Sequence, residues 1–174
     1  AEGIHSLVLD VKYGRAAFMQ HSEKARELAV SMVQVGTQLG INVTAQLTQM
    51  DHPLGNWLGN SHEIYESIQC LKGMGPEDTM ELVYAQGKAL GFDLEEVIGN
   101  GTALNEFREM LIRQGVEIEI ADQLLLDPWS VLPKGPQQYV LKAEKTGHIA
   151  DIDALILGQV LCEAGAGRSR QGQE

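Results

Sequence analysis

The alternation of apolar and polar positions divides the first part of the chain into strands and a helix. Residues 6–11 (SLVLDV) form a short apolar run that is typical of a strand buried on both faces. Residues 22–39 carry apolar and small side chains at helical spacing, which predicts a helix with Ser22 as its N-cap and Gly40 as its stop. Residues 41–47 alternate apolar and polar positions and predict a second strand. This order predicts a parallel pair of strands joined by a helix.

Residues 48–76 contain Gly, Pro and Asn at short intervals, and these residue types require particular backbone conformations. Asn60 and Glu63 have the spacing of a capping box, so we expect Glu63 to cap a helix. The inward face of that helix is predicted to carry Ile64, Ile68 and Leu71. Pro76 has the character of a first helical residue and predicts the start of the next helix.

A third short helix is predicted over residues 102–115, and after it the pattern weakens. Residues 128–136 concentrate prolines and a glycine, which predicts a linker. Beyond the linker we expect two short strands and a helix, over residues 139–144, 147–150 and 153–164.

These elements predict an α/β fold with a partial, mostly parallel sheet and flanking helices, followed by the start of a β-rich α+β module. The predicted division is an α/β part over residues 1–127, a linker over residues 128–136 and the beginning of a C-terminal module over residues 137–174.

Composition excludes several classes of function. The net charge of -11 is unfavourable for binding nucleic acid, because contact with phosphates requires clustered Lys and Arg. No run approaches eighteen apolar residues, so a membrane span is not predicted. Cys70 and Cys162 belong to no metal-binding pattern, and we expect them to be reduced thiols of a cytoplasmic protein.

Two positions are candidates for binding a ligand. Lys12 stands at the carboxyl end of the first predicted strand, where open α/β sheets bind ligands, although it can equally pair with Asp10. His62 and Glu66 lie in a stretch that resembles the zinc-protease signature, but Glu66 stands where the second histidine is needed, so a zinc site is not expected.

A site for a hard cation such as K⁺ or Ca²⁺ is better supported. The turn from Leu54 to Trp57 can direct backbone carbonyls inward, and Glu66 returns a carboxylate from the following helix. Oxygen donors of these kinds suit such ions. The alternative is that Glu66 lies on a solvated helix face.

Together these residues resemble the thymidine and pyrimidine-nucleoside phosphorylases. The resemblance extends in the same order over essentially the whole chain, and so many spaced Gly and Pro matches are more specific than any one motif. It rests on Asp10-Val11-Lys12, Gly14, Ala17-Phe18-Met19, Thr48, Met50, Pro53-Leu54-Gly55, Gly59-Asn60, Glu63, Leu71, Gly73, Gly75-Pro76, Asp78 and Gly165-Ala166-Gly167-Arg168. Tyr13 and Arg15 replace smaller residues that are common in the family, and Ser61-His62 replaces a usually apolar pair.

The resemblance implies phosphorolysis, in which phosphate as co-substrate attacks the anomeric carbon of a pyrimidine nucleoside and releases the base and a (2-deoxy)ribose 1-phosphate. It also implies a homodimer with no organic cofactor. The phosphate loop and the residues that hold the base are expected N-terminal to the position of Ala1, so no catalytic residue is assigned in this chain. We therefore expect a C-terminal piece of a longer enzyme, inactive without the missing N-terminal portion.

The resemblance further implies that Leu54 and Trp57, through backbone oxygens, and Glu66, through its carboxylate, hold a structural ion in the full-length enzyme. Two alternatives to the pyrimidine-nucleoside phosphorylase stay open. One is a nucleoside monophosphate (AMP) phosphorylase, and the other is a non-catalytic scaffold or regulatory module of the same fold.

Overall fold

The computed structural model describes residues 3–166 and contains two strands and eight helices in that range. The chain divides into two compact units. The first unit consists of residues 3–54, 81–94 and 151–166 of the described chain, and the second of Gly55–Met80 and Glu95–Ala150. Within the described residues, no helix has both the length and the apolar character needed to cross a membrane.

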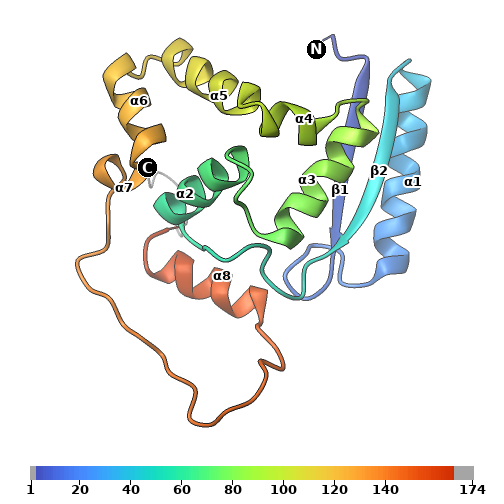
Figure 1. Ribbon diagram of the computed structural model, residues 1–174. Helices are drawn as coiled ribbons and strands as arrows, with labels where there is room; N and C mark the ends of the chain where they lie inside the picture. Colours follow the sequence, from blue (N-terminus) through green and yellow to red (C-terminus); the bar gives the residue numbers. More distant parts are fainter. Residues whose placement is uncertain (1–2, 167–174) are drawn as a thin grey trace. The chain divides into compact units, whose positions relative to one another are not determined.

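The first unit is built on two parallel strands, β1 (Ser6–Tyr13) and β2 (Asn42–Gln49), joined by α1 (Ser22–Gln38). Figure 1 shows the two strands side by side. The register runs from Ser6 opposite Asn42 to Tyr13 opposite Gln49. The prediction of a parallel strand–helix–strand arrangement is confirmed, and with it the α/β class of the fold.

The core of the first unit lies between α1 and one face of the strand pair. Val11 is buried together with Ala25 and Ala29, whose small side chains allow the helix to lie close to the strands. Gly36 continues this face, because a Cβ atom built on it would lie 2.3 Å from Cγ2 of Val43. The prediction of Ser22 as N-cap was wrong by one residue: His21 holds that position and makes no side-chain cap hydrogen bond.

The opposite face of β2 meets α3 (Glu77–Ala89), whose later residues belong to the first unit. Gln46 alternates with the residues that face α1, and its Nε2 donates a hydrogen bond to the carbonyl oxygen of Ala85 at 3.1 Å. On the same face Lys12 pairs with Asp10, with 2.7 Å between Nζ and Oδ2. Of the two interpretations of Lys12, the structure therefore shows the ion pair.

The second unit is helical. Its helices include α2 (Asn60–Leu71), α4 (Leu94–Gly99), α5 (Thr102–Arg113), α6 (Ile118–Leu126) and α7 (Pro128–Val131). Ile68 of α2 is fully buried, as predicted, whereas Ile64 is 41% exposed. Arg108 joins α5 to α6 through Asp122, and Nζ of Lys72 donates to the carbonyl oxygen of Leu125 at 2.6 Å.

The segment after α7 differs from the prediction. The expected strands over residues 139–144 and 147–150 do not form, and the next regular element is α8 (Ala154–Glu163). Apolar side chains that a strand would pack, such as Tyr139 and Leu141, are 84% and 99% exposed. A β-strand needs a hydrogen-bonded partner, and no strand in the described range pairs with these residues. The predicted domain limits stay a prediction, and residues 167–174 of the last domain lie outside the described range.

The close approach of α1 to β2 gives a testable prediction. Gly36→Ala forces a methyl group against Val43, and we expect it to lower the free energy of unfolding by about 1–3 kcal/mol. Val43→Ala makes room for that methyl group, so Gly36→Ala should cost much less in a Val43→Ala background. Urea unfolding followed by circular dichroism measures both effects.

Gly158 of α8 is the matched control, because a Cβ atom built there meets nothing within 4 Å. Gly158→Ala should be neutral or stabilise the protein by up to about 1 kcal/mol. Equal losses for both substitutions would show that contact with Val43 is not the cause.

Candidate functional site

Two carboxylates accept hydrogen bonds from the backbone of the turn that begins the second unit. The backbone N–H of Asn56 donates to Oε1 of Glu66 at 2.7 Å, and the backbone N–H of Gly55 donates to Oδ2 of Asp78 at 3.1 Å. Glu66 comes from α2 and is only 8% exposed, whereas Asp78 lies in the first turn of α3. Two consecutive amides are thus satisfied by side chains from two helices.

Gly55 is required at this turn for two reasons. Its φ is +75°, a conformation that residues with a side chain rarely adopt. A Cβ atom built on it would also lie 2.3 Å from Oε2 of Glu66. The Pro-Leu-Gly-Asn sequence therefore allows the Glu66 carboxylate to lie directly against the backbone.

Glu63 acts as a cap, as the sequence predicted, but one residue earlier than the spacing suggested. Its Oε1 accepts the backbone N–H of Gly59 at 3.0 Å, and Gly59, with φ of +102°, is the N-cap of α2. The cap fixes the start of α2, on which Glu66 lies one turn further along. Sequence spacing therefore identified Glu63 correctly as the capping carboxylate, but it paired Glu63 with Asn60 instead of Gly59.

A small cavity of about 220 Å³ lies between this turn, α2 and the residues before α3. Trp57 and Glu66, two of the predicted ion ligands, both line it. The full lining is Asn56, Trp57, Tyr65, Glu66, Gln69, Met74, Gly75 and Pro76. The third predicted ligand, Leu54, is 45% exposed and is the last residue of the first unit's opening segment.

At this turn one backbone amide is directed at the Glu66 carboxylate, and the role of the Leu54 and Trp57 carbonyls as ion ligands stays a prediction. An amide N–H, that of Asn56, faces one carboxylate oxygen. The part of the chain that the structure describes contains no group of three or more His, Cys, Asp or Glu side chains arranged to hold a metal. Of the predicted ion ligands, Glu66 offers a buried carboxylate.

Aromatic rings stack beside the cavity. The Trp57 ring lies 5.4 Å from that of His62 in a stacked arrangement and 5.1 Å from that of Tyr65 edge-on, measured between centroids. Trp129 of α7 stacks on Tyr65 at 5.0 Å, and Nζ of Lys134 lies 5.8 Å from the Trp129 ring. This cluster ties the turn to α7 within the second unit.

The contribution of Trp129 was not predicted, because residues 128–136 were interpreted as a linker. A proline at the first position of a helix, directly after Asp127, is a helix-start signal that identifies α7 in retrospect. From the sequence, Asp78 was used only as one of the residues of the family resemblance, and its hydrogen bond to Gly55 depends on tertiary contact that spacing does not report.

Cys70, near the end of α2, lies against Gly75. A Cβ atom built on Gly75 would be 2.5 Å from Sγ of Cys70 and 2.9 Å from the sulfur of Met80. Burial, reinforced by the negative charges of Glu66 and Asp78, raises the pKa of the Cys70 thiol. Cys162, in contrast, is exposed.

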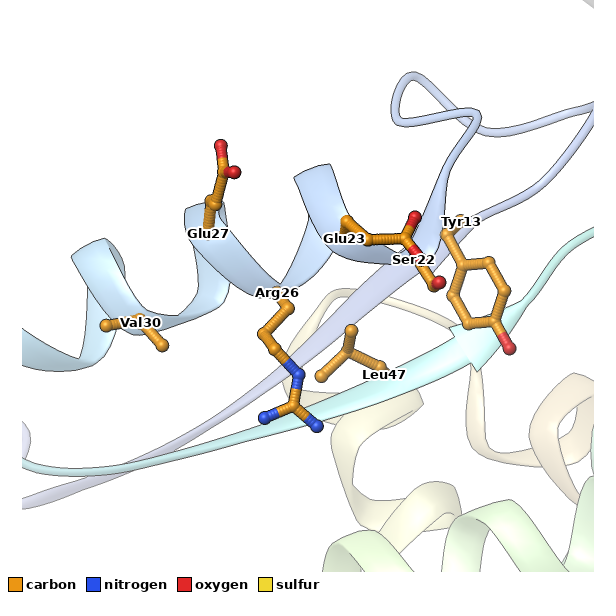
Figure 2. A pocket seen from close by; sticks show the side chains of 7 residues that line it. All are labelled: Tyr13, Ser22, Glu23, Arg26, Glu27, Val30 and Leu47. Atoms are coloured by element: carbon orange, nitrogen blue, oxygen red, sulfur yellow. The ribbon is translucent and has the colours of Figure 1, made fainter.

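A larger open groove of about 750 Å³ lies in the first unit, where α1 begins beside the ends of the strands. Figure 2 shows Arg26 extended over Leu47 with Tyr13 and Ser22 nearby. Glu23, Glu27 and Val30 complete the lining. Two carboxylates and one guanidinium leave the groove without the positive charge that a phosphate site requires, so it is not favoured as an anion site.

Comparison with known proteins confirms the resemblance drawn from the sequence. The chain is 39% identical over 189 residues to thymidine phosphorylase of Homo sapiens, and 38% identical over 179 residues to thymidine phosphorylase of Mycobacterium tuberculosis (strain ATCC 25618 / H37Rv). It is 40% identical over 187 residues to pyrimidine-nucleoside phosphorylase of Bacillus subtilis (strain 168).

These alignments include 99%, 99% and 100% of the chain but only 39%, 40% and 42% of the respective relatives, and they correspond to a C-terminal portion of them. The chain thus spans about two fifths of the length of the curated relatives it matches. No family model matches the chain.

The environment of Cys70 gives the second prediction. In a Cys162→Ser background, Glu66→Gln removes a negative charge near the thiol and should lower its pKa. More thiolate is then present at pH 8, so reaction with a disulfide reagent should become several-fold faster. The rate against pH measures the pKa of the thiol directly.

Two further variants separate charge from disruption of the turn. Asp78→Asn should accelerate the reaction less than Glu66→Gln, because its charge has the smaller effect on Cys70. Glu119→Gln, at an exposed position of α6, should leave the rate unchanged. A Cys70 pKa that is the same with and without Glu66 contradicts the assignment.

Proposed function

We propose that this chain, which is related over nearly its whole length to a C-terminal portion of the thymidine and pyrimidine-nucleoside phosphorylases, serves in the phosphorolysis of pyrimidine nucleosides. In that reaction phosphate attacks the anomeric carbon of the nucleoside. The carbon–nitrogen bond to the base breaks, and the products are the free pyrimidine and a (2-deoxy)ribose 1-phosphate. The observation that carries the proposal is an identity of 38–40% that extends across the whole chain.

Within that reaction the described residues have a supporting role. Phosphorolysis needs donors that hold phosphate and donors that stabilise the negative charge of the departing base. At the Gly55 turn the amides of Gly55 and Asn56 already donate to Asp78 and Glu66, so these two donors are not free to hold phosphate. We therefore assign no catalytic residue to this chain, and we place the phosphate loop and the base-binding residues in a portion of the enzyme outside these 174 residues.

We further propose that Leu54, Trp57 and Glu66 contribute to a site for K⁺ or a Ca²⁺-like ion in the complete enzyme. Glu66 fits this role because it is buried, and only one of its oxygens accepts the Asn56 amide. Ca²⁺ takes six to eight oxygen ligands, roughly, so two carbonyls and one carboxylate form only part of a site. The remaining ligands must come from another part of the enzyme.

The same resemblance supports a cytoplasmic homodimer as the working form. Cys70 and Cys162 are both free thiols, in keeping with a reducing compartment. The surfaces that form the dimer are proposed to lie outside this chain, together with the catalytic residues.

A chimeric enzyme tests the proposed reaction. The portion of the Bacillus subtilis relative that aligns with this chain is replaced by the 174 residues, and release of base is measured with phosphate and thymidine, uridine or AMP. We expect turnover of a pyrimidine nucleoside by the chimera and none by the 174-residue chain alone. Turnover of AMP alone would instead support the nucleotide phosphorylase.

The control is to establish that the chimera is folded. A chimera that forms the relative's native oligomer, binds phosphate and turns over none of the three substrates would support the non-catalytic scaffold. Activity of the 174-residue chain by itself would overturn the assignment of the catalytic residues to another part of the enzyme.

The ion proposal is tested in the same chimera by thermal unfolding at increasing KCl or CaCl₂. Binding to the folded state stabilises it by about 2.7 kcal/mol when the ion is at 100 times its Kd. Glu66→Ala should abolish this dependence, whereas Glu119→Ala should retain it. If the chimera with Glu66→Ala responds to the ion as the parent does, Glu66 is not a ligand.

A further inference from the structure

Arg15 joins two segments that lie far apart in the chain. It lies two residues after the end of β1. Its guanidinium donates two hydrogen bonds to the carboxylate of Asp151, at 2.8 Å from Nη1 to Oδ2 and 2.7 Å from Nη2 to Oδ1. The two residues are separated by 136 positions and belong to the same unit. A two-pronged arginine–carboxylate pair fixes direction as well as distance.

The same arginine also contacts the segment that follows β2. Its backbone N–H donates to Oδ1 of Asp51 at 2.7 Å, and Nη2 donates to the carbonyl oxygen of Asp51 at 3.3 Å. That carbonyl oxygen in turn accepts the backbone N–H of Ala154 at 3.0 Å. Arg15 therefore connects the ends of both strands to the first residue of α8.

Asp153 accepts hydrogen bonds both from Arg15 and from the N-terminal turn of α8. One oxygen, Oδ2, accepts Nη1 of Arg15 at 3.2 Å. The other, Oδ1, caps α8 by accepting the backbone N–H groups of Leu155 and Ile156 at 2.9 and 3.2 Å. Attachment of α8 and capping of α8 thus depend on the same carboxylate.

Arg15 offsets part of the negative charge at this junction, because Asp51, Asp151 and Asp153 face a single guanidinium. The backbone N–H of Arg15 lowers the pKa of Asp51, and the hydrogen bond from the guanidinium lowers the pKa of Asp151. Nδ1 of His52 lies beside the group as well, 3.2 Å from Oδ1 of Asp151. Without the guanidinium, three carboxylates would repel one another across segments 51 and 151–153.

Apolar packing contributes little to holding α8. None of its residues is buried, and Leu155, Ile156 and Val160 are 44%, 57% and 53% exposed. A helix with this exposure is held mainly by its polar end contacts, in contrast to α1, which buries Ala25 and Ala29.

We propose that Arg15 is an ionic latch that holds the start of α8 against the carboxyl-terminal ends of β1 and β2, and that breaking the latch releases α8 from that edge. The latch rests on contacts within this chain and does not depend on the proposed reaction. The latch therefore sets whether α8 covers the carboxyl ends of the two strands, the edge at which open α/β sheets generally bind ligands.

Hydrogen exchange followed by mass spectrometry tests the latch in the 174-residue chain. Arg15→Gln should accelerate exchange of the amides of residues 154–158 by about three- to tenfold, while α1 stays protected and shows that the unit is folded. The matched control is Arg108→Gln, which removes a comparable arginine pair with Asp122 in the second unit. It should accelerate exchange in α5 and α6 only.

Two further arms distinguish an ionic latch from ordinary packing. Raising NaCl to about 1 M shortens the Debye length to about 3 Å, so exchange in α8 should accelerate in the parent chain and stay constant in Arg15→Gln. Arg15→Lys, which keeps the positive charge but cannot make the two-pronged pair with Asp151, should retain part of the protection that Arg15→Gln loses. Unchanged exchange of residues 154–158 in Arg15→Gln, or equal loss of protection in Arg15→Lys and Arg15→Gln, overturns the proposal.

Discussion

Parallel pairing of β1 with β2 is the constraint on which the first unit depends. The register that places Tyr13 opposite Gln49 brings the segments after both strands to the same edge, where the N–H of Met50 bonds to the carbonyl oxygen of Tyr13. Gly14 and Asp51 then meet so closely that a Cβ atom on Gly14 would lie 2.5 Å from Oδ1 of Asp51. A shift of register by one residue would separate Arg15 from Asp51 and turn Val11 away from α1.

Elements whose pattern reflects burial within the chain were predictable. β1, α1 and β2 were identified because their apolar positions face one another, as Val11 and Ala29 do. Residues 139–150 carry the same kind of pattern but have no partner in the described range, so propensity alone gave strands where the backbone is irregular. Helix α6 was missed because the pattern weakens after the helix over residues 102–115, and α7 was missed because Asp127-Pro128 was interpreted as a break rather than a helix start.

The turn at Gly55 and its neighbouring helix were predictable, whereas the hydrogen bonds of the turn were not. Glycine and proline spacing identified the turn at Gly55, and helical spacing placed Glu66 on the following helix. Which backbone atoms face Glu66 depends on the rotation of single peptide planes, and sequence spacing does not report it. In the structure the amide of Asn56 bonds to one oxygen of the buried Glu66 carboxylate.

The discontinuity of the first unit has a consequence for the order of folding during synthesis. Its last segment begins at Asp151, the ion-pair partner of Arg15. The ribosome must therefore add 136 residues after Arg15 before this partner is present. At about 5–20 residues per second this takes on the order of ten seconds, far longer than a helix needs to form. During that interval the nascent strand pair exposes its carboxyl-terminal edge, and the residues of the second unit emerge and can fold first. Closure of the first unit is therefore a late event, coupled to the arrival of its C-terminal segment.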